Sequence, residues 1–155
     1  MIENYVTYYE SPIGIIEVTS TEDEILTCNF VDQEKSSTSN PTILLDSLKQ
    51  LNEYFEGNRV EFDLKLKLNG TVFQNVVWNA LQTVPYGKTI SYKELAKKIE
   101  HETAIRAVGS ANGQNPISII IPCHRIIGSD GKLRGYGGGI KKKKWLLEFE
   151  ARNVK

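Results

Sequence analysis

The sequence has few cysteines and histidines, the residues from which disulfide frameworks and zinc sites are built. Its 155 residues include two cysteines, Cys28 and Cys123, and two histidines. Two cysteines cannot form the several disulfides that hold small secreted domains together, so a reducing cytoplasm is the expected location. Residues 1–66 contain Cys28 but no histidine, so a tetrahedral site of the usual Cys/His kind cannot be assembled there. We expect no bound metal.

Long apolar runs are also missing. No run approaches the roughly 18–20 residues that cross a bilayer. Residues 1–5 lack a basic region followed by an apolar stretch, so no signal peptide is expected. With 40% apolar and 25% charged residues the composition is that of a globular chain, and 155 residues suit one domain or two small ones.

A net charge is absent as well, because two charged halves cancel. Residues 1–70 hold 13 acidic and 5 basic side chains, a formal charge of −8. Residues 71–155 hold 6 acidic and 14 basic ones, a formal charge of +8. Such asymmetry is typical of a protein that presents one surface to a polyanion. We expect the basic half to bind nucleic acid and the acidic half to face away from it.

The first half predicts an antiparallel sheet and one helix. Short β-branched and aromatic runs, separated by turn-forming residues, predict strands at 5–9, 14–18 and 25–30. Helical spacing of leucines predicts a helix over 41–55, which Asn40 can cap. Residues 60–66 alternate strictly, as a half-buried strand or an extended linker would. The charge changes sign near 68–72, where we place the boundary between an acidic domain, 1–70, and a basic domain, 71–155.

The second half predicts helices. Apolar spacing predicts one over 73–81, and Ser91 and Glu94 form the capping-box pattern that begins another, which continues to Ile99. Thr103 can cap a further short helix over 104–112. Two short helices, a tight connection and basic surroundings suggest a DNA-binding helix-turn-helix, although the same pattern fits any helical hairpin.

The outward face of the second short helix carries Arg106, Ala107 and Ser110. One cation among small residues lets a helix approach a nucleic-acid groove closely, with the arginine reaching in. The same face would also pack well on another helix, with Arg106 in solvent.

A lone cysteine follows an apolar segment, 117–121, that has the composition of a buried strand. Pro122 interrupts strand pairing, so Cys123, His124 and Arg125 are presented where the strand ends. A cysteine is nucleophilic as its thiolate, which a nearby imidazole and cations favour. The alternative is a buried, inert cysteine.

These residues together resemble the O6-alkylguanine-DNA alkyltransferases, the methylated-DNA–protein-cysteine methyltransferases. The signature is Ile-Pro-Cys-His-Arg-Ile at 121–126. Further matches lie at 90–92, 106–109, 115–116, 135–138 and 144–147, and in the first half at 11–14 and 54–57. The resemblance implies an α+β fold, with a ribonuclease H-like N-terminal domain (an antiparallel sheet with a helix) and a mostly helical C-terminal domain that contains a helix-turn-helix.

The resemblance also implies roles in the chemistry. Cys123 matches the acceptor that attacks the alkyl carbon on guanine O6 and keeps it as a thioether. His124 matches the base that takes the thiol proton through a water, and Glu150 matches the carboxylate that orients the imidazole. Asn115 matches the residue that braces the active-site turn, and Tyr92 matches a tyrosine beside the flipped guanine and its rotated phosphate. No cofactor is implied, because the lesion itself donates the alkyl group.

The implied partner is double-stranded DNA bearing O6-alkylguanine, bound in the minor groove by a monomer. A base inside a duplex hides its O6 atom, so the nucleotide must be flipped out. Arg106 matches the arginine that fills the vacated stack, and the hydroxyl of Tyr136 would approach guanine N3. The remaining residues expected to face DNA or substrate are Ala107, Ser110, Arg125, Gly137 and Gly138.

Some positions depart from the family pattern. Gly137 stands where some relatives have serine, and residues 112–114 replace a segment that is often more basic. The run of four lysines at 141–144 is interpreted as a solvated charge run, with direct phosphate contact as the alternative.

The sequence is therefore interpreted as that of a direct-reversal DNA repair protein that acts once per molecule. One rival is a non-catalytic, alkyltransferase-like lesion-binding protein, which Cys123 argues against because those relatives carry another residue there. The other is a cysteine hydrolase that uses Cys123 and His124, for which the sequence offers no evident oxyanion hole.

Overall fold

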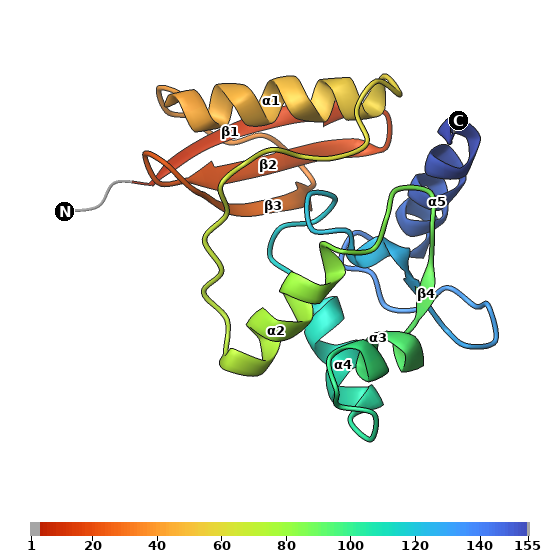
Figure 1. Ribbon diagram of the computed structural model, residues 1–155. Coiled ribbons are helices and arrows are strands. Elements are labelled where there is room, and N and C mark those ends of the chain that lie inside the picture. Colours follow the sequence, from red (N-terminus) through yellow and green to blue (C-terminus); the bar gives the residue numbers. More distant parts are fainter. Residues whose placement is uncertain (1–3, 155) are drawn as a thin grey trace. The chain divides into compact units, whose positions relative to one another are not determined.

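The computed structural model describes residues 4–154 (Figure 1). These residues fall into two compact units, and the chain passes from the first to the second between Leu68 and Asn69. No helix in the described range is both long enough and apolar enough to span a bilayer. The fold is mixed α+β, as predicted, and each unit builds its own core.

The N-terminal unit contains a three-stranded antiparallel sheet. Its strands β1 (Tyr5–Ser11), β2 (Gly14–Ser20) and β3 (Ile25–Val31) follow one another in the order β1-β2-β3, which confirms the predicted meander. The turn between β1 and β2 is closed by the Ser11 hydroxyl, which donates to the Gly14 carbonyl at 2.6 Å. Gly14 has a φ of 135°, a conformation that a side chain would strain.

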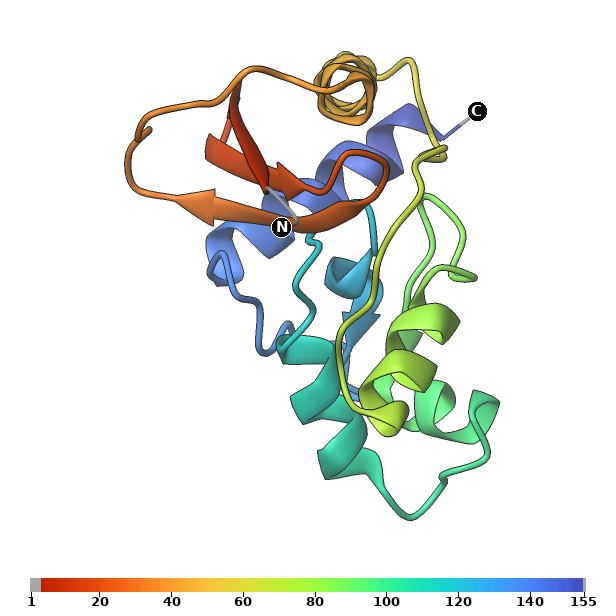
Figure 2. The ribbon, with the colours of Figure 1, turned by 90° about the vertical axis from the view of Figure 1, so that its left-hand side faces the viewer.

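Helix α1 (Thr42–Phe55) covers one face of this sheet (Figures 1 and 2). Leu44, Leu51 and Tyr54 are buried on its inner side, as the leucine spacing predicts. The predicted cap at Asn40 is wrong, because the helix begins one residue later. Pro41 is its N-cap, and the Pro41 carbonyl accepts the first helical hydrogen bond, so no side chain caps the end.

Residues 60–66 form no strand of their own, so the linker alternative is the correct one for this segment. A single parallel bridge joins Leu66 to Ile25 at the edge of the sheet. The backbone N–H groups of Ile25 and Lys67 donate to the Lys65 and Ile25 carbonyls at 2.8 Å and 2.9 Å.

The C-terminal unit is mostly helical, as predicted. Helices α2 (Val72–Leu81), α3 (Tyr92–Lys98) and α4 (Ile105–Gly113) pack against one another, and α3 with α4 forms the predicted helix-turn-helix. The capping box between Ser91 and Glu94 is present at the start of α3. The expected Thr103 cap is absent, because Ala104 is the N-cap of α4 and no side chain accepts a hydrogen bond there.

The segment 117–121 is a tight turn, so the predicted strand is wrong. Ile119 has a φ of 72°, which is unusual for a β-branched residue, and the Ile121 N–H donates to the Ile117 carbonyl at 3.0 Å. The isoleucines are buried, so the apolar composition correctly indicates burial. It does not reveal strand pairing, because the side chain of Asn115 supplies hydrogen bonds that a neighbouring strand would otherwise make.

After this turn the chain crosses to the last helix. A single 3₁₀ turn, η1 (Cys123–Arg125), leads into β5 (Ile126–Ile127), which pairs in parallel with β4 (Ile90–Ser91). A glycine-rich loop then connects β5 to α5 (Ile140–Asn153), which packs against η1. The turn that carries Cys123 is therefore held between the helix-turn-helix side of this unit and its final helix.

Candidate active site

Cys123 begins the 3₁₀ turn, and only 5% of its surface is exposed. Burial raises the pKa of its thiol above the ordinary value, whereas a hydrogen bond from Asn115 and the charge of Lys143 act in the opposite direction. The thiol is therefore enclosed, but it has partners that favour its ionised form.

Two buried asparagines hold the backbone around the thiol. The Asn115 amide nitrogen donates to the Ile121 carbonyl at 2.8 Å and to the Ile117 carbonyl at 3.3 Å, and its oxygen accepts from the Ile117 N–H at 3.0 Å. The Asn112 amide donates to the Cys123 carbonyl at 3.4 Å. The bracing role predicted for Asn115 agrees with this geometry. Asn112 has no such role in the sequence interpretation, because an asparagine in a short helix gives no signal of its distant partner.

His124 and Glu150 form a fully buried pair. The Nε2 atom of His124 lies 2.7 Å from Oε2 of Glu150. A carboxylate only accepts hydrogen bonds, so Nε2 carries the proton and Nδ1 retains a lone pair. Nδ1 is buried and has no hydrogen-bond partner among residues 4–154. Burial lowers the pKa of His124 despite the nearby carboxylate, so the imidazole is neutral at pH 7 and can accept a proton at Nδ1.

Arg125 lies in the interior, which differs from the DNA-facing position expected from the sequence. Its Nε and Nη2 atoms donate to the two Glu150 oxygens at 2.8 Å and 3.0 Å, and Nη1 donates to the Val84 carbonyl at 2.8 Å. Burial by itself raises the pKa of Glu150, but the hydrogen bonds and charges of His124 and Arg125 outweigh it and hold the pKa well below its ordinary value. Arg125 therefore positions Glu150, and its buried guanidinium is directed at this carboxylate and at the Val84 carbonyl.

Lys143 is the charged residue near the thiol that sequence reasoning missed. It belongs to the run of four lysines at the start of α5, yet its side chain is fully buried. The interpretation of this run as solvated charges is therefore wrong for Lys143. Its Nζ donates to the Arg134 carbonyl at 2.6 Å and lies 5.7 Å from the centre of the Tyr92 ring. Burial lowers its pKa to about 8. The sequence does contain a signal of this burial. Residues three apart lie on the same face of a helix, and Lys143 is three residues before the buried Leu146 in α5.

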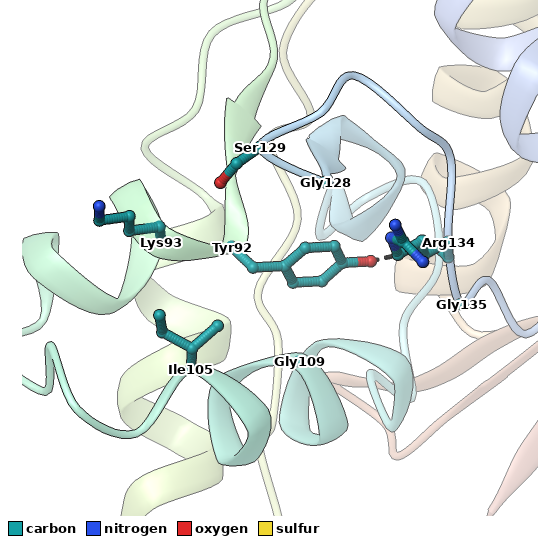
Figure 3. A pocket seen from close by; sticks show the side chains of 8 residues that line it. All are labelled: Tyr92, Lys93, Ile105, Gly109, Gly128, Ser129, Arg134 and Gly135. Carbon is teal, nitrogen blue, oxygen red and sulfur yellow. Dashed lines mark hydrogen bonds between the residues drawn. The ribbon is translucent and has the colours of Figure 1, made fainter.

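Tyr92 lies in an open pocket of about 470 Å³ between the helix-turn-helix and the loop that follows β5 (Figure 3). Its hydroxyl donates to the Arg134 carbonyl at 3.0 Å. Burial raises the pKa of Tyr92, and the proximity of Cys123 adds to the effect, so the tyrosine lies within electrostatic reach of the thiol. The pocket is lined by Tyr92, Lys93, Ile105, Gly109, Gly128, Ser129, Arg134 and Gly135.

The residues predicted to face DNA lie on two other segments. Arg106, Ala107 and Ser110 are exposed on one side of α4, while Val108 on the opposite side is buried. In the glycine-rich loop Tyr136 is buried, Gly137 is exposed and Gly138 is half-buried. A side chain at Gly137 would meet no atom within 4 Å, so the serine found in some relatives would fit there.

No three His, Cys, Asp or Glu side chains within residues 4–154 are grouped so that they could hold a metal ion. The cluster around Cys123 consists of a thiol, a neutral imidazole, a carboxylate and two cations, Arg125 and Lys143.

Comparisons with known proteins agree over nearly the whole chain. A family model described as 6-O-methylguanine DNA methyltransferase, DNA binding domain, matches residues 72–152. A second, described as 6-O-methylguanine DNA methyltransferase, ribonuclease-like domain, matches residues 4–68. A methylated-DNA–protein-cysteine methyltransferase of Mycolicibacterium paratuberculosis is 48% identical over 149 residues, which are 93% of this chain and 90% of that protein. One from Methanosarcina acetivorans is 45% identical over 94% of this chain and 97% of its own length.

Solved structures give the same result. The crystal structure of Mycobacterium tuberculosis O6-methylguanine methyltransferase is 44% identical, covers 99% of this chain and 96% of its own, and superposes with a TM-score of 0.90. A structure of the M. tuberculosis protein in complex with DNA is 47% identical, covers 95% and 94% of the two chains, and has a TM-score of 0.86.

Proposed function

Because this chain belongs to the methylated-DNA–protein-cysteine methyltransferase family, we propose that Cys123 is the cysteine that receives the methyl group. The other cysteine, Cys28, is fully buried in a strand, and burial alone raises the pKa of its thiol to about 12. A thiol with that pKa supplies almost no thiolate at neutral pH. The donor is O6-alkylguanine in duplex DNA, so the reaction needs no cofactor.

One observation carries the assignment of the base. His124 directly follows the cysteine, its Nε2 is bonded to Glu150 at 2.7 Å, and its Nδ1 lone pair is buried without a partner in the described range. A neutral imidazole held by a carboxylate is the arrangement that accepts a proton and is then stabilised as imidazolium. We assign the transfer of the proton from the Cys123 sulfur to Nδ1 to a bridging water.

The transfer then proceeds as a displacement at the alkyl carbon. The thiolate forms a bond to carbon as the bond between carbon and guanine O6 breaks, and the bonding electrons remain on the purine. The guanine ring regains the proton that left the thiol, so the products are a neutral thioether and neutral guanine. The Tyr136 hydroxyl at guanine N3 would offset charge that develops on the purine as it leaves. A thioether is not readily reversed, so each chain acts once.

The base reaches the thiol by flipping out of the duplex. We assign the exposed face of α4 to the minor groove, with Arg106 filling the vacated space, Ala107 and Ser110 against the backbone, and Gly137 and Gly138 close to the base. The DNA complex of the M. tuberculosis relative supports a nucleic-acid partner. Binding as a monomer and a cytoplasmic location stay predictions.

Mass spectrometry tests this function directly. After incubation with a duplex that contains O6-methylguanine, we expect one added methyl group on the peptide that holds Cys123. A duplex with unmodified guanine is the matched control and should leave the peptide unchanged. An unmodified Cys123 in protein that binds the lesion duplex would instead indicate a non-catalytic lesion-binding protein. Repeated turnover of an ester would indicate a hydrolase.

A further inference from the structure

The carboxylate of Glu150 is also held by a part of the chain to which the proposed function gives no role. The backbone N–H of Gly87 donates to Oε1 of Glu150 at 3.3 Å, although the two residues are 63 apart in sequence. Gly87 belongs to residues 84–87, in the connection between α2 and β4 that runs beside α5 (Figure 1). We call residues 84–87 the carboxylate turn.

The carboxylate turn also binds the arginine that pairs with Glu150. The Val84 carbonyl accepts a hydrogen bond from Nη1 of Arg125 at 2.8 Å. The Cζ atom of Arg125 lies over the ring of Tyr86, 5.6 Å from its centre. A guanidinium within about 6 Å of the centre of an aromatic face is attracted to the ring. The turn therefore holds Arg125 at a carbonyl and at an aromatic face, while the other two guanidinium nitrogens bind Glu150.

The surrounding structure keeps this turn in place. Ile90 of β4 pairs in parallel with Ile126 of β5, which directly follows η1, so the segments leading into the two strands run side by side. On its other side the turn packs against the end of α5. Gly87 has a φ of 77°, and a Cβ there would overlap Cγ2 of Val154, so a glycine is needed for this close approach.

Resting on the proposed function, we propose that Tyr86 is a positioning residue for methyl transfer. Its ring holds Arg125 against Glu150, and Glu150 in turn holds the imidazole of His124. The carboxylate accepts two hydrogen bonds from Arg125, one from His124 and one from Gly87. A carboxylate has about four acceptor positions, so these donors fix its orientation. The proton of His124 then stays on Nε2, and Nδ1 can accept the proton of the thiol.

A displaced Arg125 would also change how readily His124 takes up a proton. The titratable groups on the elements packed around His124 are Cys123 and Arg125 in η1, Lys143 and Glu150 in α5, and Tyr86 in the carboxylate turn. Burial lowers the pKa of His124, Glu150 raises it, and the charges of Arg125 and Lys143 lower it. If Arg125 moves away, one of the lowering influences is lost and the pKa of His124 rises. An imidazole that is already protonated cannot accept the proton of the thiol.

The first test removes the aromatic face. We expect Tyr86→Leu to slow single-turnover methyl transfer from an O6-methylguanine duplex about tenfold at pH 7, because the groups around the thiol are misplaced. The acidic limb of its pH-rate profile should move to higher pH. Tyr86→Phe keeps the ring and should restore the wild-type profile and most of the rate. Phe73→Leu, which replaces another half-buried aromatic residue of the same unit, is the matched control and should leave the profile unchanged. A wild-type profile in Tyr86→Leu would overturn the proposal.

The second test asks whether Tyr86 acts through Glu150. If it does, the effects of the two residues on the rate are not additive. Tyr86→Leu should then slow transfer less than about twofold in protein that already carries Glu150→Gln, compared with about tenfold in wild type. An equal slowing in both backgrounds would show that Tyr86 acts by another route and would contradict the proposal.

A third measurement does not depend on activity. NMR of the imidazole nitrogens during a pH titration reports the protonation of His124, and the chain has one other histidine, His101, which is exposed. In Tyr86→Leu the pKa of His124 should rise, while the signals of His101 should stay as in wild type. An unchanged titration of His124 would contradict the proposal.

These results separate the role of Tyr86 from the function on which it rests. If wild-type protein is not methylated at Cys123 by the lesion duplex, the proposed function fails, and the role of Tyr86 in transfer fails with it. If wild type is methylated and Tyr86→Leu transfers with the wild-type rate and pH profile, only the positioning role fails.

Discussion

Cys28 and Cys123 are both buried, and burial raises the pKa of both thiols, yet their surroundings differ. Cys28 lies in the middle of β3 opposite Val18, and desolvation is the one influence that shifts its pKa. Desolvation also raises the pKa of the Cys123 thiol, but there a hydrogen bond from Asn115 and the charge of Lys143 act to lower it. Burial alone makes a cysteine inert, and a reactive one needs polar partners brought into the same enclosed space.

The difference extends to the backbone. Cys28 lies in β3, where it is paired with Val18 of β2. Cys123 follows a turn that contains Ile119 at a φ of 72°, a conformation that costs on the order of 1–3 kcal/mol for a β-branched residue. The Asn115 side chain offsets that cost by holding the turn with its hydrogen bonds. A strained turn at one cysteine and a paired strand at the other fit one functional and one structural thiol.

Replacing Cys123 should produce the largest effect. We expect Cys123→Ala to abolish methyl transfer and to retain binding to an O6-methylguanine duplex, because the exposed face of α4 is unchanged. The measurement is methyl incorporation from a labelled duplex, with Cys28→Ala as the matched control. Residual transfer by Cys123→Ala, or its loss in Cys28→Ala, would reverse the roles assigned to the two cysteines.

Replacing Glu150 should lower the stability of the fold. Glu150→Gln leaves the buried Arg125 guanidinium without an opposite charge, so we expect the free energy of unfolding to fall by about 3 kcal/mol. The pKa of Glu150 is lowered in the folded state, so its stabilising effect is present at neutral pH and disappears as the carboxyl becomes protonated in acid.

Denaturant unfolding at several pH values tests this prediction. The difference between wild type and Glu150→Gln should be largest near pH 7 and should shrink in acid. Glu148→Gln, at an exposed position on the same helix, should stay within about 0.5 kcal/mol of wild type. A pH-independent difference would argue against the charge as the cause.

Replacing the buried Lys143 should change the rate of methyl transfer and the stability of the fold, each with its own dependence on pH. Lys143→Met removes a charge that favours the Cys123 thiolate, so the pH-rate profile should move to higher pH and transfer at pH 7 should slow about tenfold, the equivalent of one pKa unit. The pKa of Lys143 is lowered to about 8, so its burial destabilises the fold below that pH. The stability of Lys143→Met relative to wild type should therefore decline as pH rises above 8. Lys144→Met, at an exposed position, is the control.

The smallest effect is expected at the other thiol. Cys28→Ala should lower the free energy of unfolding by about 1 kcal/mol, the usual effect of a modest loss of packing, and should leave the rate of methyl transfer unchanged. Thermal unfolding and single-turnover transfer measure the two quantities. A change in transfer rate without a change in stability would show that the N-terminal unit influences the chemistry.

Local patterns predicted most of the secondary structure because they report local physics. The strands of the meander, α1 and the helix-turn-helix were all predictable from apolar spacing and from the capping box at Ser91. The segment 117–121 was not, because β-branched apolar residues indicate burial, whereas its conformation depends on the side chain of Asn115.

The charged residues of the site were harder to place, because their partners are distant in sequence. Arg125 is interior through contacts with Val84 and Glu150, which no local pattern records. Lys143 is hidden within a lysine run although its neighbours Lys141 and Lys144 are exposed. The resemblance to a known family predicted roles for Cys123, His124 and Glu150, but the buried ion pair between Arg125 and Glu150 and the buried Lys143 required the three-dimensional structure.

The position of α5 after the thiol has a consequence for protein synthesis. Lys143 and Glu150 both belong to this helix, which the ribosome makes after Cys123. Chains grow at about 5–20 residues per second, so a nascent chain carries the cysteine for a time without its cation or the carboxylate that holds His124. We expect the assembled site, with His124 bonded to Glu150 and Lys143 buried, to form only once α5 has been made and has docked.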